Sequence, residues 1–298
     1  MLQLNPSRVL LPAYCCRSLV EACAGHRFEF YPLTEDLAPD VHFLERTARA
    51  GDHILAINYF GKAPSHLFQK FVEQHQDLLF IEDCAQALST NVPQWGHWRL
   101  FSPRKLVGVA DGGFIIPRNG KQPQIFVRSA SVDSVVSRWS AALLRFEDRE
   151  EKFNSLWHSR NQENERSMKV EDKKISSLSY GLLSQFDVDR IIRQRKTNYH
   201  ALYSALSHVS LLKDSEPAYA PFGFPIRVAA RIRDKLIEHL VYNHIFPAVH
   251  WRDLVAPAFD FEFEHQLSKE ILTLPCDQRY GLEEMSYIAM VTQKFLAE

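Results

Sequence analysis

The fold of this chain is decided by the stretch Phe101-Ser102-Pro103-Arg104-Lys105, which is followed by Asp111-Gly112-Gly113. Twenty-two residues before the lysine stands Asp83, in the segment Ile81-Glu82-Asp83-Cys84-Ala85-Gln86-Ala87. Taken singly these features are ordinary, because a lysine before a strand is usually a solvated charge and an aspartate after a strand is often a helix cap. Their order along one chain makes them informative.

The chemistry that uses these residue types in this order is that of pyridoxal phosphate (PLP). A lysine amine forms a Schiff base with the PLP aldehyde and then moves a proton, which is the role predicted for Lys105. A carboxylate facing the pyridine nitrogen keeps that nitrogen protonated, and Asp83 is suited to this role. Gln86 is expected to contact the phenolic oxygen of the ring. The paired glycines 112–113 allow a tight turn behind the lysine.

The pattern around this motif predicts an α/β fold. Short apolar runs alternate with amphipathic stretches, so we expect a mostly parallel central sheet covered on both faces, within a large domain of residues 1–192. Working residues in such sheets lie just past the carboxyl ends of the strands. The expected strands are Val9–Tyr14, His26–Tyr31, His53–Tyr59 and Leu78–Glu82, and the expected helices are Ser18–Gly25, Asp40–Ala50 and Ser65–His75.

The rest of the chain differs in texture. Asp133–Asn161 is predicted to be largely helical, and Ile175–Leu206 carries apolar residues at the spacing of a long helix. The charge-rich segment Gln162–Lys174 is predicted to be a solvated loop, with a partner-contacting arm as the alternative. Residues 193–298 are expected to hold a smaller α+β domain, with a strand at Pro225–Val228 and a terminal helix at Leu282–Leu296.

The chain resembles the DegT/DnrJ/EryC/StrS family of sugar aminotransferases, which have the aspartate-aminotransferase fold. The matching pieces occur in order along almost the whole chain. They are Leu11-Pro12-Ala13-Tyr14, Asn58-Tyr59-Phe60-Gly61, Glu82-Asp83-Cys84-Ala85-Gln86-Ala87, Lys105 with Asp111-Gly112-Gly113, Ile175–Tyr199 with Arg195-Lys196, and Leu272-Thr273-Leu274-Pro275.

This resemblance implies a set of roles at the matched positions. Lys105 would be the Schiff-base lysine, Asp83 the partner of the pyridinium and Gln86 a ring contact. The resemblance also implies a homodimer with active sites at the subunit interface, glutamate as amino donor and a keto-sugar nucleotide as acceptor. Asn58 and Tyr59 are further candidates for substrate contact.

Several departures from the family pattern concern the grip on the cofactor phosphate. The family's Gly-Thr-x-Ala-Leu-like helix start, which cradles the phosphate, has no counterpart in the residues before Val9. The family's phosphate-binding serine falls on Leu100, so Ser102 is the substitute candidate. The ring-stacking aromatic falls on Cys16, with Tyr14 two residues away. A catalytically inactive scaffold or interaction protein of the same fold is therefore the alternative to an aminotransferase.

His250-Trp251 follows the apolar stretch Ile245–Val249 in the predicted small domain. We expect His250 either to reach the substrate across the cleft or to form a structural aromatic pair with Trp251. The histidines and cysteines show no zinc-ligand spacing, so no metal is expected.

Net charge, apolar run length and cysteine content limit which other classes of protein this chain could belong to. A net charge of -1 over 298 residues gives no overall attraction to nucleic acid or anionic membranes, so we expect neither as a partner. A basic helix face is accordingly predicted to be solvated; it comprises Arg190, Arg193, Arg195 and Lys196. No apolar run reaches the ~18 residues of a membrane-spanning helix. Five cysteines without a C-x-x-C pair favour a reduced, cytoplasmic setting.

Overall fold

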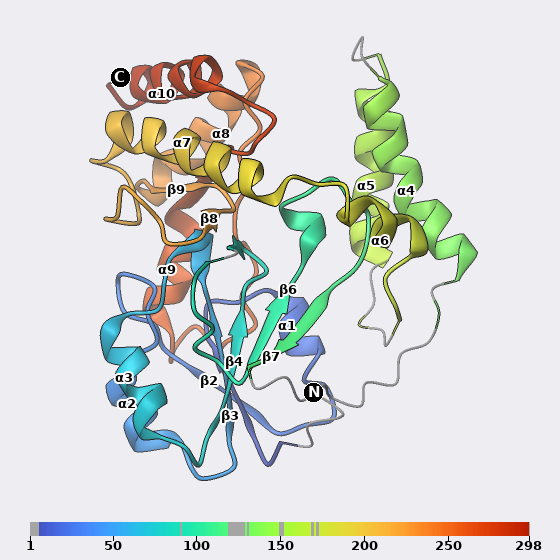
Figure 1. The fold of residues 1–298 in the computed structure, drawn as a ribbon. Helices are drawn as coiled ribbons and strands as arrows, with labels where there is room; N and C mark the ends of the chain where they lie inside the picture. Colours follow the sequence, from blue (N-terminus) through green and yellow to red (C-terminus); the bar gives the residue numbers. More distant parts are fainter. Residues whose placement is uncertain are drawn as a thin grey trace.

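The structure is a computed structural model that describes residues 6–89, 91–118, 129, 131–148, 152–167, 170 and 173–297. Its centre is a six-stranded sheet of order β2-β1-β3-β4-β6-β7 (Figure 1). The first five strands in this order run parallel, and β7 is antiparallel to β6. The strands are β1 (Val9–Pro12), β2 (Phe28–Tyr31), β3 (His53–Ile57), β4 (Leu79–Asp83), β6 (Trp98–Phe101) and β7 (Phe114–Pro117).

The central strands are short continuous apolar runs, as expected for strands covered on both faces. Every residue of β1 and β3 is buried. The strand register places Asp83 opposite Ile57 on one side and Leu100 on the other. Asp83 therefore lies at the carboxyl edge of the sheet, between two neighbouring strands.

Three helices cover the sheet: α1 (Arg17–Glu21), α2 (Val41–Thr47) and α3 (His66–Gln74). With right-handed crossovers, α2 and α3 lie on one face and α1 on the other, as Figure 1 shows. The side chains of Asp40 and Ser65 cap α2 and α3 by accepting backbone N–H bonds of 3.0 and 3.2 Å. The predicted helix–strand alternation of the first part is confirmed, with shorter helices than expected.

A smaller α+β lobe follows. An antiparallel pair, β9 (Phe224–Arg227) and β10 (Ile271–Leu274), packs with helices around a second hydrophobic core. The helices around this core are α7 (Val188–Leu206), α8 (Ala230–Tyr242) and α10 (Leu282–Ala297), whereas α9 (Glu262–Glu270) contributes Leu267 to the core that contains the sheet. In Figure 1 the arrows of β4 and β6 point towards this lobe. The expected boundary between residues 192 and 193 falls inside α7, and α9 was not expected from the sequence.

The segment between sheet and lobe forms three helices, α4 (Val132–Glu147), α5 (Asn154–Ser167) and α6 (Ser177–Leu183). Helices α4 and α5 pack on each other and stand apart from the sheet and the lobe in Figure 1. The predicted loop Gln162–Lys174 is wrong at its start, since α5 continues to Ser167; residues 168, 169, 171 and 172 lie outside the described part. The long helix expected over Ile175–Leu206 is two helices, α6 and α7. Within the described residues, no helix is long and apolar enough to cross a bilayer.

Candidate functional site

The site is built around Asp83, the last residue of β4. Its carbonyl accepts the backbone N–H of Asn58 at 2.9 Å, and its Oδ1 accepts that of Ala85 at 2.7 Å. Burial raises the pKa of the Asp83 carboxyl, while the positive charge of Lys105 opposes that shift. A cation facing this carboxyl favours its charged form. The sheet therefore presents a fixed, buried carboxylate that is stabilised by a neighbouring positive charge.

Lys105 ends a 3₁₀ turn, η2 (Pro103–Lys105), that follows β6. Proline at the first position presets the turn, and the Lys105 N–H donates to the carbonyl of Ser102 at 3.1 Å. The charge of this lysine lowers the pKa of Asp83 and that of His250. The structure thus brings together three sequence-predicted residues from three separate elements.

Gln86 lies three residues after Asp83, just before the short strand β5 (Ala87–Leu88). Its side chain is 1% exposed, and its Oε1 accepts the N–H of Phe60 at 3.1 Å. Its Nε2 is buried and has no hydrogen-bond partner among the residues that the structure describes. Because buried donors are nearly always satisfied, this amide fits an oxygen acceptor on a bound molecule.

His250 reaches the site from the small lobe, beside an isolated bridge between Ala248 and Thr273. Its Nδ1 lies 3.1 Å from Thr273 Oγ1, and its ring contacts Phe60 and Phe222 at centroid distances of 6.0 and 5.0 Å. Burial, together with the charge of Lys105, lowers the pKa of His250 to about 4. The imidazole is therefore neutral at pH 7 and lies within reach of the charge of Lys105.

Behind Asp83, the side chain of Glu82 has no exposed surface and anchors a buried polar network. Its Oε1 accepts from Asn58 Nδ2 at 3.0 Å and from the Tyr219 hydroxyl at 2.8 Å, and its Oε2 accepts from Arg99 Nε at 2.9 Å. The amide of Asn58 is thus used inside the protein. These bonds give Asn58 a structural role at the strand ends; the substrate contact predicted for it stays a prediction.

The other predicted residues are more dispersed. Tyr59, in the turn η1 (Tyr59–Gly61), donates its hydroxyl to the carbonyl of Tyr14. Both rings pack against Trp251, at centroid distances of 6.5 Å for Tyr59 and 5.4 Å for Tyr14. These contacts give both tyrosines a packing role. The substrate contact predicted for Tyr59 and the cofactor contact predicted for Tyr14 have no further support in the geometry.

Cys16, at the position of the ring-stacking aromatic, and Ser102, the candidate for the phosphate, are both partly accessible. Cys16 is the N-terminal cap residue of α1, with its Sγ 3.0 Å from the hydroxyl of Ser18. Ser102 directly precedes η2, and its hydroxyl makes no capping hydrogen bond there. Of the two, Ser102 is tied to Lys105 by the turn itself.

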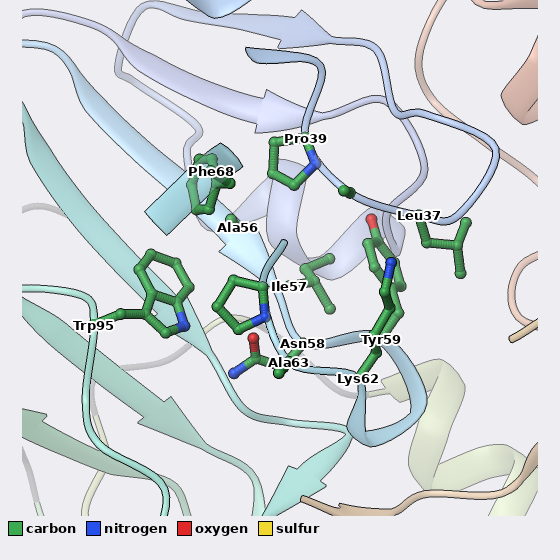
Figure 2. A pocket seen from close by; sticks show the side chains of 12 residues that line it. Leu37, Pro39, Ala56, Ile57, Asn58, Tyr59, Lys62, Ala63, Phe68 and Trp95 are labelled. Atoms are coloured by element: carbon green, nitrogen blue, oxygen red, sulfur yellow. The ribbon is translucent and has the colours of Figure 1, made fainter. Parts of the chain in front are cut away.

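A very small cavity of about 10 Å³, partly open to solvent, lies beside the ends of β3 and η1 (Figure 2). It is lined mostly by apolar side chains, including Ile57 and Phe68, together with Asn58, Tyr59 and Trp95. Neither Asp83 nor Lys105 lines it. This cavity is therefore separate from the group around Lys105.

One prediction about charge is wrong. Arg195 was expected on a solvated basic face, but it is 3% exposed and bonds to backbone carbonyls of the site region. On the same helix, Arg190 and Arg193 are exposed, as expected. Sequence spacing alone gave no signal that separated Arg195 from its neighbours. Among the described residues there is no cluster of three or more histidine, cysteine or acidic side chains suited to a metal ion.

The sequence profile of the DegT/DnrJ/EryC1/StrS aminotransferase family matches residues 35–292. The chain belongs to this family. Family membership confirms the resemblance seen in the sequence. No curated protein matches the chain in sequence.

Solved structures of DegT/DnrJ/EryC1/StrS proteins share the fold. An aminotransferase of this family from Brucella abortus superposes with a TM-score of 0.65 at 16% identity, covering 99% of this chain and 81% of that one. NtdA from Bacillus subtilis, solved with bound cofactor PMP, gives 0.67 at 15% identity, covering 100% and 70%. The sugar aminotransferase CalS13 from Micromonospora echinospora gives 0.62 at 14% identity, covering 97% and 80%. The predicted fold class, an α/β domain with a mostly parallel sheet and a smaller α+β lobe, is confirmed.

Proposed function

We propose that this protein is a PLP-dependent aminotransferase that transfers an amino group from glutamate to a keto-sugar nucleotide or a similar carbonyl compound in sugar biosynthesis. The observation that carries the proposal is the position of Lys105. Its positive charge acts both on Asp83 of the sheet and on His250 of the small lobe, which supports a shared site for the three side chains. Membership of an aminotransferase family supports the same reaction.

The residues of the site fit the ring of PLP. The buried carboxylate of Asp83 is suited to the pyridine nitrogen, and the unpartnered Nε2 of Gln86 is suited to the phenolic oxygen. When bound, PLP supplies a protonated ring that withdraws electrons from the reacting carbon. NtdA, a protein of the same fold, was solved with PMP bound.

The chain's own side chains then have separate tasks. Lys105 would hold the cofactor, and its amine would move the proton that transamination transfers. His250 is neutral and anchored to Thr273, so it can exchange a hydrogen bond with a polar group of the substrate. Phe60 and Phe222 pack edge-on against this imidazole and hold its ring in place.

The phosphate group of PLP has fewer proposed ligands in this chain than the ring has. Ser102 is the side chain we propose as a phosphate ligand, because its hydroxyl makes no capping bond and its carbonyl is bonded to Lys105. Cys16 and Tyr14 remain proposals for the ring face. Leu100, at the family's serine position, lies within β6, and its apolar side chain cannot donate a hydrogen bond to a phosphate.

The test is titration of the purified protein with PLP. We expect an absorbance band in the near-ultraviolet or visible, and covalent trapping on Lys105 by borohydride. Lys105→Ala is expected to abolish both, whereas Lys70→Ala, which changes an exposed lysine of α3, leaves both intact. A wild-type protein without the band at saturating PLP contradicts the proposal.

We also propose that the protein is a homodimer. Strand β7 at the sheet edge and helix α4 expose large apolar side chains, which on soluble proteins mark interaction surfaces. The side chains include Phe114, Ile115, Ile116, Val132, Val136 and Phe146. All five cysteines are free, which supports a reducing compartment such as the cytoplasm.

The second candidate function is a catalytically inactive scaffold of the same fold. The observation that favours it is the identity of two residues at the family's cofactor-binding positions. Leu100 stands at the position of the phosphate-binding serine, and Cys16 stands at that of the ring-stacking aromatic residue. Turnover of glutamate with a keto-sugar nucleotide refutes this candidate. Tight dimerisation without PLP binding supports it.

A further inference from the structure

A buried arginine joins the lysine turn to the small lobe. Arg195 lies on α7 and is 3% exposed. Its N–H groups donate hydrogen bonds to four acceptors, none of which is a carboxylate. Its Nη2 donates to the carbonyl of Leu106 at 3.1 Å. Leu106 directly follows Lys105 and closes η2. The guanidinium therefore holds the backbone beside the candidate catalytic amine.

A second side chain holds the same carbonyl. Gln278 Nε2 donates to the Leu106 oxygen at 2.9 Å, while Gln278 Oε1 accepts from Arg195 Nε at 2.7 Å. The three groups form a closed ring of hydrogen bonds around one carbonyl. Gln278 is itself held in place, because Asn198 of α7 donates to the flanking carbonyls of Asp277 and Tyr280, both at 3.0 Å.

The remaining donors of Arg195 reach the opposite wall. Its Nη1 donates to the carbonyls of Pro221 at 2.8 Å and Phe222 at 3.1 Å. Phe222 packs edge-on against His250, with ring centroids 5.0 Å apart. One guanidinium thus fixes both the turn that carries Lys105 and the aromatic residue that supports His250.

We infer that Arg195 and Gln278 are positioning residues for Lys105: they share the carbonyl of Leu106 and hold the lysine turn against the small lobe. This inference rests on the proposed function, since the turn is the one that presents the amine to the cofactor. A lysine on a 3₁₀ turn has little rigidity of its own, because one short turn makes few internal hydrogen bonds. We call the hydrogen bonds of Arg195 and Gln278 to the Leu106 carbonyl the clamp. They hold the turn in the precise position that covalent catalysis requires.

The decisive variants are Gln278→Met and Gln278→Glu in the full chain. Methionine keeps the volume and removes both bonds. Glutamate keeps the contact with Arg195 Nε but turns an oxygen towards the Leu106 oxygen. We expect both variants to lower the rate of borohydride-trapped PLP attachment to Lys105 by roughly tenfold, the loss that follows from one hydrogen bond at this site. Arg193→Gln, an exposed change on the same helix, should leave the rate unchanged.

The glutamate variant separates positioning from support of the fold. If the only role of Gln278 is to accept the hydrogen bond from Arg195 Nε, the Gln278→Glu variant will attach PLP as fast as the wild type, and the inference is overturned. Arg195→Lys provides a second test, with weaker attachment than wild type and a retained melting temperature expected. Unchanged attachment in Gln278→Met overturns the inference as well.

Hydrogen–deuterium exchange keeps this inference distinct from the proposed function. In the cofactor-free protein, the amides of Leu106 and Val107 are bonded to the carbonyl of Pro103. We expect Gln278→Met to speed their exchange about tenfold while α10 is unaffected. Absence of covalent PLP in the wild type would refute the proposed function alone, and the exchange result would still decide the clamp: faster exchange supports it, and unchanged exchange overturns it.

Discussion

The site around Lys105 and the α4–α5 hairpin are held together by different kinds of contact. In the site, buried polar groups are fixed by partners from distant parts of the sequence, as the Leu106 carbonyl is by Arg195 and Gln278. In the hairpin, two helices pack on each other and expose apolar side chains, with Phe146 70% and Val136 61% exposed. The hydrogen bonds named for the first region are all made within one chain. The second has the surface of a region that is completed by another molecule.

An ion pair between a partly exposed arginine and an exposed glutamate joins the two regions. Arg104 Nη1, one residue before Lys105, lies 2.7 Å from Glu165 Oε1 of α5. Exposed pairs of this kind contribute little to stability. The comparison therefore predicts that changes in the site affect chemistry and global stability, whereas changes in the hairpin affect assembly.

The largest expected effect is that of Asp83→Asn. Loss of the carboxylate that faces the positive groups of the site should lower turnover by roughly 100- to 1,000-fold, as for other preorganised electrostatic groups. The measurement is kcat with saturating PLP and substrates. Asp77→Asn, at an exposed position before the same strand, serves as control and should retain activity. Equal turnover of Asp83→Asn and wild type would show that the buried carboxylate is only structural.

Next in size is the pH dependence that His250 confers. Its pKa is about 4 in the folded protein, against an ordinary value of 6.5. Below pH 6.5 the unfolded chain binds a proton that the folded chain rejects. The free energy of unfolding should therefore fall as pH drops from 6.5 to 4, by about 3 kcal/mol in total from this residue.

Urea unfolding across this pH range tests that expectation. His250→Asn should have a flatter stability curve than wild type between pH 6.5 and 4, and the two curves should run parallel above pH 6.5. The pKa of His53 and of His97 is also lowered by burial, and both contribute equally to the two proteins. Parallel curves over the whole range would contradict the assignment to His250.

A smaller effect is expected in the hairpin. Phe146→Glu should weaken self-association by roughly 30-fold, which corresponds to the loss of about 2 kcal/mol from one buried aromatic side chain. Sedimentation equilibrium measures this change. Leu67→Glu, at an exposed apolar position of α3, is the matched control and should leave the association constant unchanged. An unaffected dimer in Phe146→Glu would exclude this face from the interface.

The smallest effects compare helix caps in the two regions. Ser65 caps α3 beside the sheet core, and Ser131 caps α4 in the hairpin. Ser65→Ala should cost about 1 kcal/mol of global stability, whereas Ser131→Ala should accelerate hydrogen exchange in α4 with little change in the melting temperature. Equal global losses would mean that the hairpin unfolds together with the core.

The sequence predicted the elements that have a strong local signal. The apolar runs gave the buried strands, and Ser65 correctly signalled the start of α3. The helix α9 was missed, since it begins at Glu262 without a side-chain cap. The long helix predicted over Ile175–Leu206 was divided by a break before Asp187, where the side chain of Asp187 caps α7 anew.

The order of Asp83, Gln86 and Lys105 along the chain, by itself, determined the fold family and the chemistry to be considered. Only the tertiary structure decided which other side chains join them. It placed His250 within reach of the charge of Lys105, enclosed the amide of Asn58 in a network with Glu82, and buried Arg195 where the sequence indicated a solvated face. The reason is physical: a motif records residues that one strand end and its following turn bring together, whereas burial and hydrogen-bond partners depend on other elements, as for Arg195 and Leu106, which are 89 residues apart.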